Sequence, residues 1–209
     1  MGDYRNTKYC PEFKNIATQK QALKGIIEQK HHVQDLYNLI SPNDGTTYKA
    51  EFMRIYNCKC CYCGVQLPII PKQLFEVDHF RHKKHKAFSS EADAGTMDNL
   101  VLSCRKCNRS KSELLIDDSD YAKLYPDDGS ITTAFIREDN YYITVAPEMK
   151  KDEKVQAFYL KLKLYEEVRR LDYLLMNIRG LKEKTSDNPR IQSLLSKAYE
   201  ILLEKRAML

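Results

Sequence analysis

The expected fold is decided by two stretches of the 209-residue sequence, Cys60-Cys61-Tyr62-Cys63-Gly64 and Cys104-Arg105-Lys106-Cys107. In each stretch two cysteines stand three residues apart, Cys60 with Cys63 and Cys104 with Cys107. This spacing lets one turn of backbone present two thiolates to a tetrahedral Zn²⁺, and two such pairs complete a Cys₄ site. The sequence therefore predicts a structural zinc site.

A competing pair stands beside the first stretch, because Cys58 and Cys61 are also three residues apart. Only Cys63 is followed by glycine, and Gly64 permits a positive φ that turns backbone N–H groups toward the sulfurs. We therefore expect Cys60 to be the partner of Cys63. The cysteines expected to be free are Cys10, Cys58 and Cys61.

Composition excludes several classes of protein. Seven cysteines are an odd number, and six of them fall in two tight clusters, which favours metal binding over disulfides in a reducing compartment. No stretch approaches the ~18–20 consecutive apolar residues of a membrane span, and the first residues lack the apolar core of a signal peptide. We expect a cytoplasmic globular protein of one or two domains that makes no membrane contact.

The two cysteine pairs enclose an unusually long insert. Common zinc ribbons separate their pairs by roughly 15–20 residues, whereas 40 residues, 64–103, stand between Cys63 and Cys104 here. The metal would hold both ends of this insert and give it a rigidity that its few apolar residues cannot supply. Residues 78–112 carry a net charge of +4 and residues 113–149 carry −7, so the insert region is a candidate surface for a polyanion.

The insert region carries three motifs in sequence order. An alternating strand, Phe75–Arg81, contains adjacent Asp78 and His79; Asp98-Asn99-Leu-Val-Leu follows; and Cys107-Asn108-Arg-Ser-Lys-Ser112 comes last. Together with the cysteine pairs, these motifs resemble the HNH endonuclease family, the ββα-metal nucleases, over residues 58–112. The spacing of Asn99 and Asn108 is similar to that in the HNH domain of RNA-guided CRISPR nucleases, an HNN variant of the motif.

The residue types suit phosphodiester hydrolysis, which needs a base for water and positive charge near the phosphate. His79, with an ordinary pKa near ~6.5, can be neutral at pH 7 and accept the proton of water. One carboxylate and one amide oxygen, from Asp78 and Asn108, can hold a hard cation such as Mg²⁺ or Mn²⁺. The resemblance implies that Asn108 is a metal ligand and that Asn99 supports the loop and the histidine.

Basic residues around these motifs are candidate contacts to a nucleic-acid backbone, which carry little sequence information. They are Arg81, Lys83, Lys84, Lys86, Arg105, Lys106, Arg109 and Lys111. We expect His82 and His85, in the same lysine-rich loop, to be solvated. DNA is the expected substrate, and two alternatives stay open: a nuclease directed at RNA, and a zinc-stapled nucleic-acid-binding module without catalysis.

Hydrophobic periodicity outlines the rest of the chain. Helices are expected over 17–40, stopped by residues 41–45, and over 47–56, with short strands in 65–80 and a helix from 105 to 115. A β-hairpin is expected over 129–145, then one long helix to about Arg179, a break at Gly180 and at 187–189, and a final helix.

These elements predict an α+β chain in four parts. The parts are an N-terminal helical arm (1–57), a zinc-stapled HNH nuclease core (58–116), an acidic segment with the β-hairpin (117–149) and a C-terminal helical hairpin (150–209).

A weaker resemblance concerns biological role. The His79–Arg81 motif, the cysteine-rich run, the hairpin and Leu162–Arg170 together look like the small HNH effector nucleases of bacterial anti-phage systems, the Septu and retron-associated type. Asp78 and His82 depart from that pattern, in which Glu and Pro are frequent. The resemblance implies a partner ATPase. The apolar stripes of the C-terminal helices suit either such a partner or a second copy of this chain.

Overall fold

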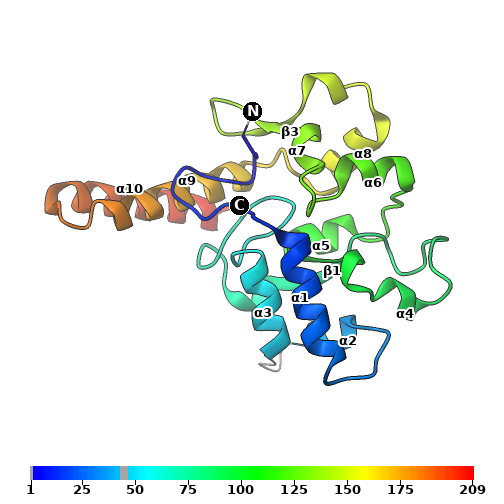
Figure 1. The fold of residues 1–209 in the computed structure, drawn as a ribbon. Coiled ribbons are helices and arrows are strands. Elements are labelled where there is room, and N and C mark those ends of the chain that lie inside the picture. The colour runs from blue at the N-terminus through cyan, green and yellow to red at the C-terminus, as the bar shows by residue number, and fades with distance from the viewer. Residues whose placement is uncertain (1, 43–46) are drawn as a thin grey trace.

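The computed structural model describes residues 2–42 and 47–209 and combines helices with two small sheets (Figure 1). Its helices are α1 (Ile16–Glu28), α2 (Tyr37–Ile40), α3 (Thr47–Ile55), α4 (Glu91–Ala94), α5 (Arg105–Lys111), α6 (Asp118–Leu124), α7 (Ile131–Ala134), α8 (Glu153–Lys161), α9 (Glu167–Lys184) and α10 (Pro189–Ala207). Its strands are β1 (Phe75–His79), β2 (Leu100–Cys104), β3 (Phe135–Arg137) and β4 (Ile143–Val145). Short 3₁₀ turns span Lys72–Leu74, Met97–Asn99 and Pro147–Met149.

The centre of the molecule is the unit β1-β2-α5. The two strands are antiparallel, with Phe75 opposite Cys104 and His79 opposite Leu100, and α5 follows β2 directly and contacts both strands. This strand-strand-helix order is the one that the HNH resemblance predicts. The α+β prediction is confirmed, although only one of the short strands expected in 65–80 forms.

The N-terminal arm differs from its prediction, because residues 17–40 do not form one helix. The periodicity continues across the break, yet α1 ends at Glu28 and α2 begins at Tyr37. Two contacts fix the bend: the backbone N–H of Leu36 donates to the carbonyl of Gly95 at 3.0 Å, and Asp35 Oδ1 accepts from the backbone of Tyr37. The helix over 47–55 agrees with the sequence. Residues 43–45 of the expected stop lie outside the described part of the chain.

The acidic segment contains the expected hairpin in a shortened form. β3 pairs with β4 from Phe135 opposite Val145 to Arg137 opposite Ile143. The residues expected to begin the first strand form the short helix α7 instead, with Ile131 and Ala134 completely buried. Burial of this apolar turn outweighs the strand preference of its β-branched residues.

The C-terminal part holds three helices where two were predicted. α8 and α9 are separated at Leu162–Glu166, where Lys163 has a φ of 53° and both Leu162 and Leu164 are fully buried. Gly180 does not end a helix: it lies inside α9, and a Cβ there would come within 2.4 Å of the Cβ of Tyr9. α9 and α10 form the predicted hairpin, which extends away from the rest of the chain (Figure 1).

The buried side chains form one cluster that draws on all four predicted segments, including Ile27, Leu102, Phe135 and Phe158. The four-part division itself stays a prediction. α10 contributes no buried residue. Within the described residues, no helix is both long enough and apolar enough to span a bilayer.

Candidate metal centre and active site

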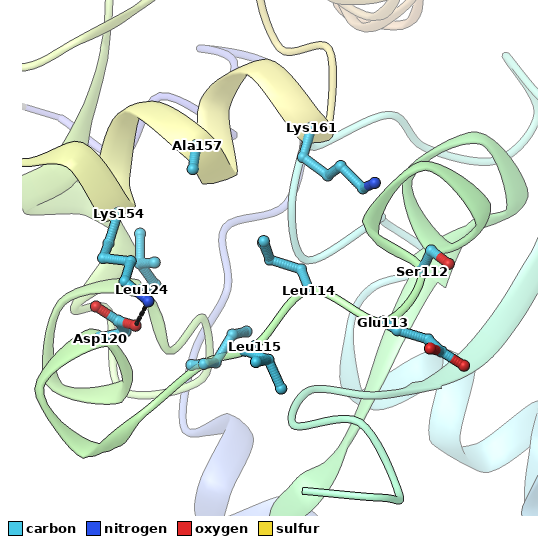
Figure 2. Close-up of a pocket in the computed structure, with 10 residues that line it drawn as sticks. Ser112, Glu113, Leu114, Leu115, Asp120, Leu124, Lys154, Ala157 and Lys161 are labelled. Atoms are coloured by element: carbon cyan, nitrogen blue, oxygen red, sulfur yellow. Dashed lines mark ion pairs between the residues drawn. The ribbon is translucent and has the colours of Figure 1, made fainter.

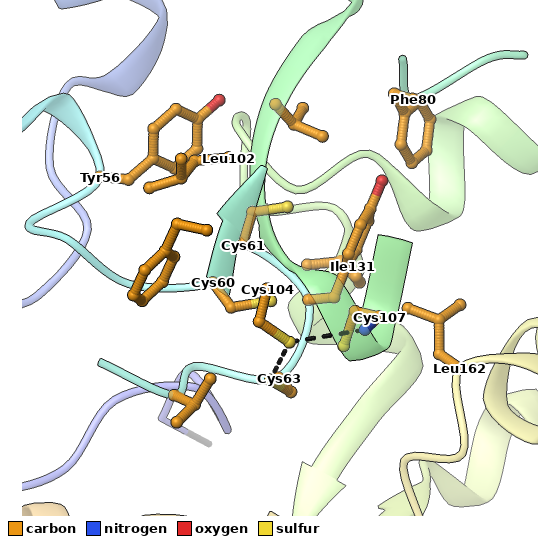
Figure 3. Packing of buried hydrophobic residues seen from close by; sticks show 14 of the residues in the cluster. Tyr56, Cys60, Cys61, Cys63, Phe80, Leu102, Cys104, Cys107, Ile131 and Leu162 are labelled. Carbon is orange, nitrogen blue, oxygen red and sulfur yellow. Dashed lines mark hydrogen bonds between the residues drawn. The ribbon is translucent and has the colours of Figure 1, made fainter. Parts of the chain in front are cut away.

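The structure brings the four predicted zinc ligands together. The Sγ atoms of Cys60, Cys63, Cys104 and Cys107 all lie within 4.8 Å of one another, and all four residues are buried (Figure 3). Sulfurs around a tetrahedral Zn²⁺ at ~2.3 Å are about 3.8 Å apart, and the Cys63 and Cys104 sulfurs are 3.9 Å apart. Number, chemistry and spacing of the donors therefore fit a zinc ion.

Local backbone structure presents these sulfurs. Gly64 has a φ of +79°, as expected, but its N–H donates to the carbonyl of Cys60 at 2.9 Å rather than to a sulfur. The backbone N–H of Cys107 approaches Cys104 Sγ at 3.5 Å at the start of α5. Hydrogen bonds from the neighbouring thiols, Cys107 foremost, hold the pKa of Cys104 well below its usual range. Burial instead raises the pKa of Cys63 and of Cys107 well above the usual range, so of these three thiols only Cys104 favours the thiolate form.

A groove of about 340 Å³ lies beside β1 and α5. Asp78 and His79 reach it from the end of β1, and Asn108 reaches it from α5. The chain order explains the arrangement: β2 ends at Cys104 and leads directly into α5, so the cysteine cluster positions the helix that carries Asn108. The other residues that line the groove are Tyr37, Val77, His82, Lys83, Ser112 and Glu113.

Asp78 is buried and held by two neighbours. Tyr62 Oη donates to its Oδ2 at 2.7 Å, and Lys111 Nζ lies 3.2 Å from its Oδ1. Burial raises the pKa of Asp78, while the charge of Lys111 and the hydrogen bond from Tyr62 act in the opposite direction. Each carboxylate oxygen has further lone pairs, so the group can still accept a cation.

Lys111 is buried, although the sequence predicts it as a contact to a nucleic-acid backbone. Its side chain is 1% exposed, and besides pairing with Asp78 it donates to the carbonyls of His79 and Phe80 at 2.8 and 3.2 Å. Its position therefore contradicts a surface contact to nucleic acid. The physical reason is that the buried Asp78 carboxylate needs a counter-charge, and Lys111 on α5 supplies it.

His79 faces the groove at the end of β1 and is half-buried. Burial lowers the pKa of its imidazole to about 4, and the nearby ammonium groups of Lys111 and Lys83 act in the same direction. The ring is therefore neutral near pH 7. A neutral imidazole can accept a proton, which is what a general base requires.

The side chain of Asn99 links two backbone segments, one at Arg81 and one at Ala94, through hydrogen bonds. Its side chain donates to the carbonyls of Arg81 and Ala94 at 3.0 and 2.9 Å and accepts from the backbone N–H of Arg81 at 2.9 Å. Its own carbonyl accepts from the backbone of Phe80. These bonds fix the backbone just after His79, in keeping with the supporting role that the resemblance implies.

Glu76 is a neighbour of Asn108 that was not predicted from the sequence. Glu76 Oε2 accepts from Asn108 Nδ2 at 2.8 Å, and its Oε1 accepts from Arg105 at the same distance. The sequence pattern could have placed Glu76 at the site, because residues 76 and 78 lie on the same face of an alternating strand. Since the Asn108 amide nitrogen is engaged, its Oδ1 is left to act as a ligand atom. Tyr62 and Tyr37 were also not predicted as site residues, and no comparable pattern in the sequence indicates them.

Four other candidate nucleic-acid contacts already have carboxylate partners. Arg81 pairs with Asp118, Lys83 with Glu91, Arg105 with Glu76 and Lys106 with Glu166, at 2.6–2.8 Å. Three others are exposed and make no ion pair with any residue that the structure describes: Lys84, Lys86 and Arg109.

The histidines of this loop are less solvated than expected. His85 is 7% exposed, with its Nδ1 accepting from the backbone of Ala87, and His82 is half-buried beside Glu113. Each ring accepts a hydrogen bond from the backbone N–H two residues further on, His82 from Lys84 and His85 from Ala87, and these bonds hold both rings within the loop.

A second pocket, of about 450 Å³, is lined by the segment that follows α5 and by residues of α6 and α8 (Figure 2). Its lining is largely apolar, with Leu114, Leu115 and Leu124, and an ion pair between Lys154 and Asp120 stands at its edge. None of the candidate catalytic residues lines it.

Comparison with known proteins supports an HNH domain over part of the chain. Searches of curated proteins and of solved structures find no match for the chain. A family model described as HNH endonuclease matches residues 60–114, which run from the first zinc ligand to just beyond α5. The chain therefore carries an HNH endonuclease domain in which four cysteines can hold a zinc ion.

Proposed function

We propose that this protein is a metal-dependent endonuclease that hydrolyses DNA phosphodiester bonds. The observation that carries the proposal is the convergence of Asp78, His79 and Asn108 on one groove within the HNH domain. A neutral histidine, a carboxylate and an amide oxygen are together the groups that metal-assisted hydrolysis needs.

In this proposal His79 takes the proton from the attacking water. Asp78 and the Oδ1 of Asn108 fit a hard divalent cation, Mg²⁺ or Mn²⁺, because both are oxygen donors on the same groove. When bound, such a cation supplies positive charge to the phosphate and leaving oxygens. Asn99 holds the backbone that presents His79.

The exposed side chains of Lys84, Lys86 and Arg109 hold the phosphate backbone in this proposal. DNA is favoured over RNA as the substrate because the motifs resemble those of DNA-cleaving HNH domains. None of the seven cysteines, all of which the structure describes, forms a disulfide, and this supports a reducing, cytoplasmic setting.

The test is cleavage of a supercoiled plasmid and of a matched RNA by purified protein. We expect Mg²⁺-dependent nicking or cutting of the plasmid, lost in EDTA and in the Asn108→Ala variant. His79→Ala should lose at least ~10²-fold in rate, while His32→Ala, an exposed control on the N-terminal arm, should cleave normally. DNA binding without cleavage would support the non-catalytic alternative, and preferential RNA cleavage would support the RNA alternative.

We further propose that the protein is the effector of an anti-phage system and acts with an ATPase partner. The sequence resemblance suggests this role, and the C-terminal hairpin supports it, because α10 buries none of its side chains. Large apolar side chains exposed on or just after α10 include Leu194, Ile201, Leu203 and Met208.

Co-expression with an ATPase encoded by a neighbouring gene tests the partnership. The double variant Leu194→Ser/Ile201→Ser should fold and cleave but no longer co-purify with the ATPase. Size-exclusion chromatography of the protein alone tests the alternative, in which a second copy of this chain binds α10. A complex that survives both substitutions would count against α10 as the docking surface.

A further inference from the structure

Arg169 reaches the cysteine cluster from outside the HNH domain. It lies on α9, is 3% exposed, and its Nη1 is 3.4 Å from Cys63 Sγ and 3.9 Å from Cys104 Sγ. One sulfur belongs to each cysteine pair, so a single guanidinium group spans the two halves of the site. Its Nη2 donates to the carbonyl of Leu162 at 3.2 Å, which fixes the orientation of the group.

The charge of Arg169 needs an anion, because burying an unpaired guanidinium group is costly. None of the ion pairs among the described residues joins Arg169 to a carboxylate. Two acids lie three residues from Arg169 in the sequence, and each pairs with another cation: Asp172 with Arg206 of α10 at 2.5 Å and Glu166 with Lys106 at 2.6 Å. The sulfurs are therefore the counter-charge: Zn²⁺ with four thiolates carries −2, and one guanidinium group reduces this to −1.

We propose that Arg169 is a positioning residue of the zinc site, donating hydrogen bonds to the thiolates of Cys63 and Cys104 and retaining the ion. The C-terminal hairpin is thereby part of the metal centre, since α9 supplies the donor and α10 holds the neighbouring Asp172. Residues that orient metal ligands in this way typically change metal affinity 10–100-fold when replaced. No local pattern in the sequence indicates this contact, because Cys63 and Arg169 are 106 positions apart.

The experiment compares zinc release from full-length zinc-loaded protein to a colorimetric chelator. Arg169→Met keeps most of the side-chain volume and removes the donors, and we expect it to release zinc ~10–100-fold faster than the wild type. Arg170→Met is the matched control: Arg170 is the next residue of α9, pairs with Glu167 and does not contact the cysteines. Its release rate should equal that of the wild type.

Two further measurements separate ligand positioning from general destabilisation. Arg169→Lys keeps the charge but loses the two-pronged geometry, so its release rate should lie between those of Arg169→Met and the wild type. In cobalt-substituted protein, loss of hydrogen bonds to sulfur should shift the thiolate-to-cobalt absorption to lower energy in Arg169→Met and leave it unchanged in Arg170→Met.

Unchanged zinc release and an unchanged cobalt spectrum in a folded Arg169→Met protein would overturn the proposal. If Arg169→Met does not fold, Arg169→Lys decides: wild-type release from that variant would overturn it as well. Wild-type protein that holds no zinc would overturn the Cys₄ assignment as well, whereas zinc-loaded protein with unchanged release from the Arg169 variants would overturn only the role of Arg169.

Discussion

The ring of Tyr37 packs against the imidazole of His79 in a tilted arrangement, with ring centroids 4.4 Å apart and ring planes inclined by 33°. Tyr37 begins α2, outside the HNH domain, and lines the same groove. The N-terminal arm therefore contributes a wall of the candidate active site and limits the rotation of the proposed general base.

Replacing this ring should lower activity without removing the zinc. Aromatic pairs contribute about 0.5–1.5 kcal/mol beyond burial, so Tyr37→Ala should slow cleavage by ~2–10-fold, and Tyr37→Phe should retain wild-type activity. Plasmid cleavage rates with zinc content measured in parallel check this. Equal loss in both variants would show that the hydroxyl, rather than the ring, is what matters.

The pKa of His79 predicts a pH dependence of stability. Its folded value of about 4 lies below the ordinary value of 6.5, so between these values the unfolded chain binds a proton that the folded chain does not. The stability that this group contributes is complete above pH 6.5 and is lost as the pH falls toward 4.

Denaturant unfolding at pH 7 and pH 5 can isolate this contribution. Wild type should lose more stability across that interval than His79→Gln, whose side chain does not titrate. NMR titration of the imidazole should show a neutral ring at pH 6, and a bound divalent cation should lower the pKa further. An identical pH dependence in both proteins would contradict the assignment.

The zinc cluster should be needed for folding as well as for activity. We expect about one zinc per chain, and Cys60→Ser or Cys104→Ser should unfold the nuclease core, because structural zinc contributes on the order of 10 kcal/mol in small metal domains. Cys58→Ser is the control, since Cys58 is outside the cluster. Elemental analysis with circular dichroism tests this, and a cooperative fold without zinc would refute it.

Replacing Lys111 should lower stability, whereas replacing Arg109 should weaken nucleic-acid binding. Lys111→Met leaves the Asp78 carboxylate without its buried partner, which should cost about 3–5 kcal/mol of unfolding free energy. Arg109→Met removes an exposed cation and should weaken DNA binding with little change in stability. Denaturant titrations and a salt-dependent binding assay distinguish them; the opposite pattern would restore Lys111 as a surface contact.

Short-range signals in the sequence determined the local parts of this protein. The three-residue cysteine spacing identified the four residues that cluster, period-2 alternation placed Asp78 and His79 at the end of β1, and the HNH motifs agreed with the family match. Each of these depends on neighbours within a few positions, where backbone geometry fixes the relation between side chains.

Only the tertiary structure decided which distant groups meet. Helical periodicity continues through residues 29–36 and 162–166, but the helices break there because the backbone of Leu36 bonds to the insert and because Leu162 and Leu164 are both buried. The partners of the site, Tyr37 on His79, Lys111 on Asp78 and Arg169 on the cysteines, are likewise contacts across the fold. Periodicity records which face of an element is apolar, whereas the partner of a buried charge is set by the packing of elements far apart in the chain.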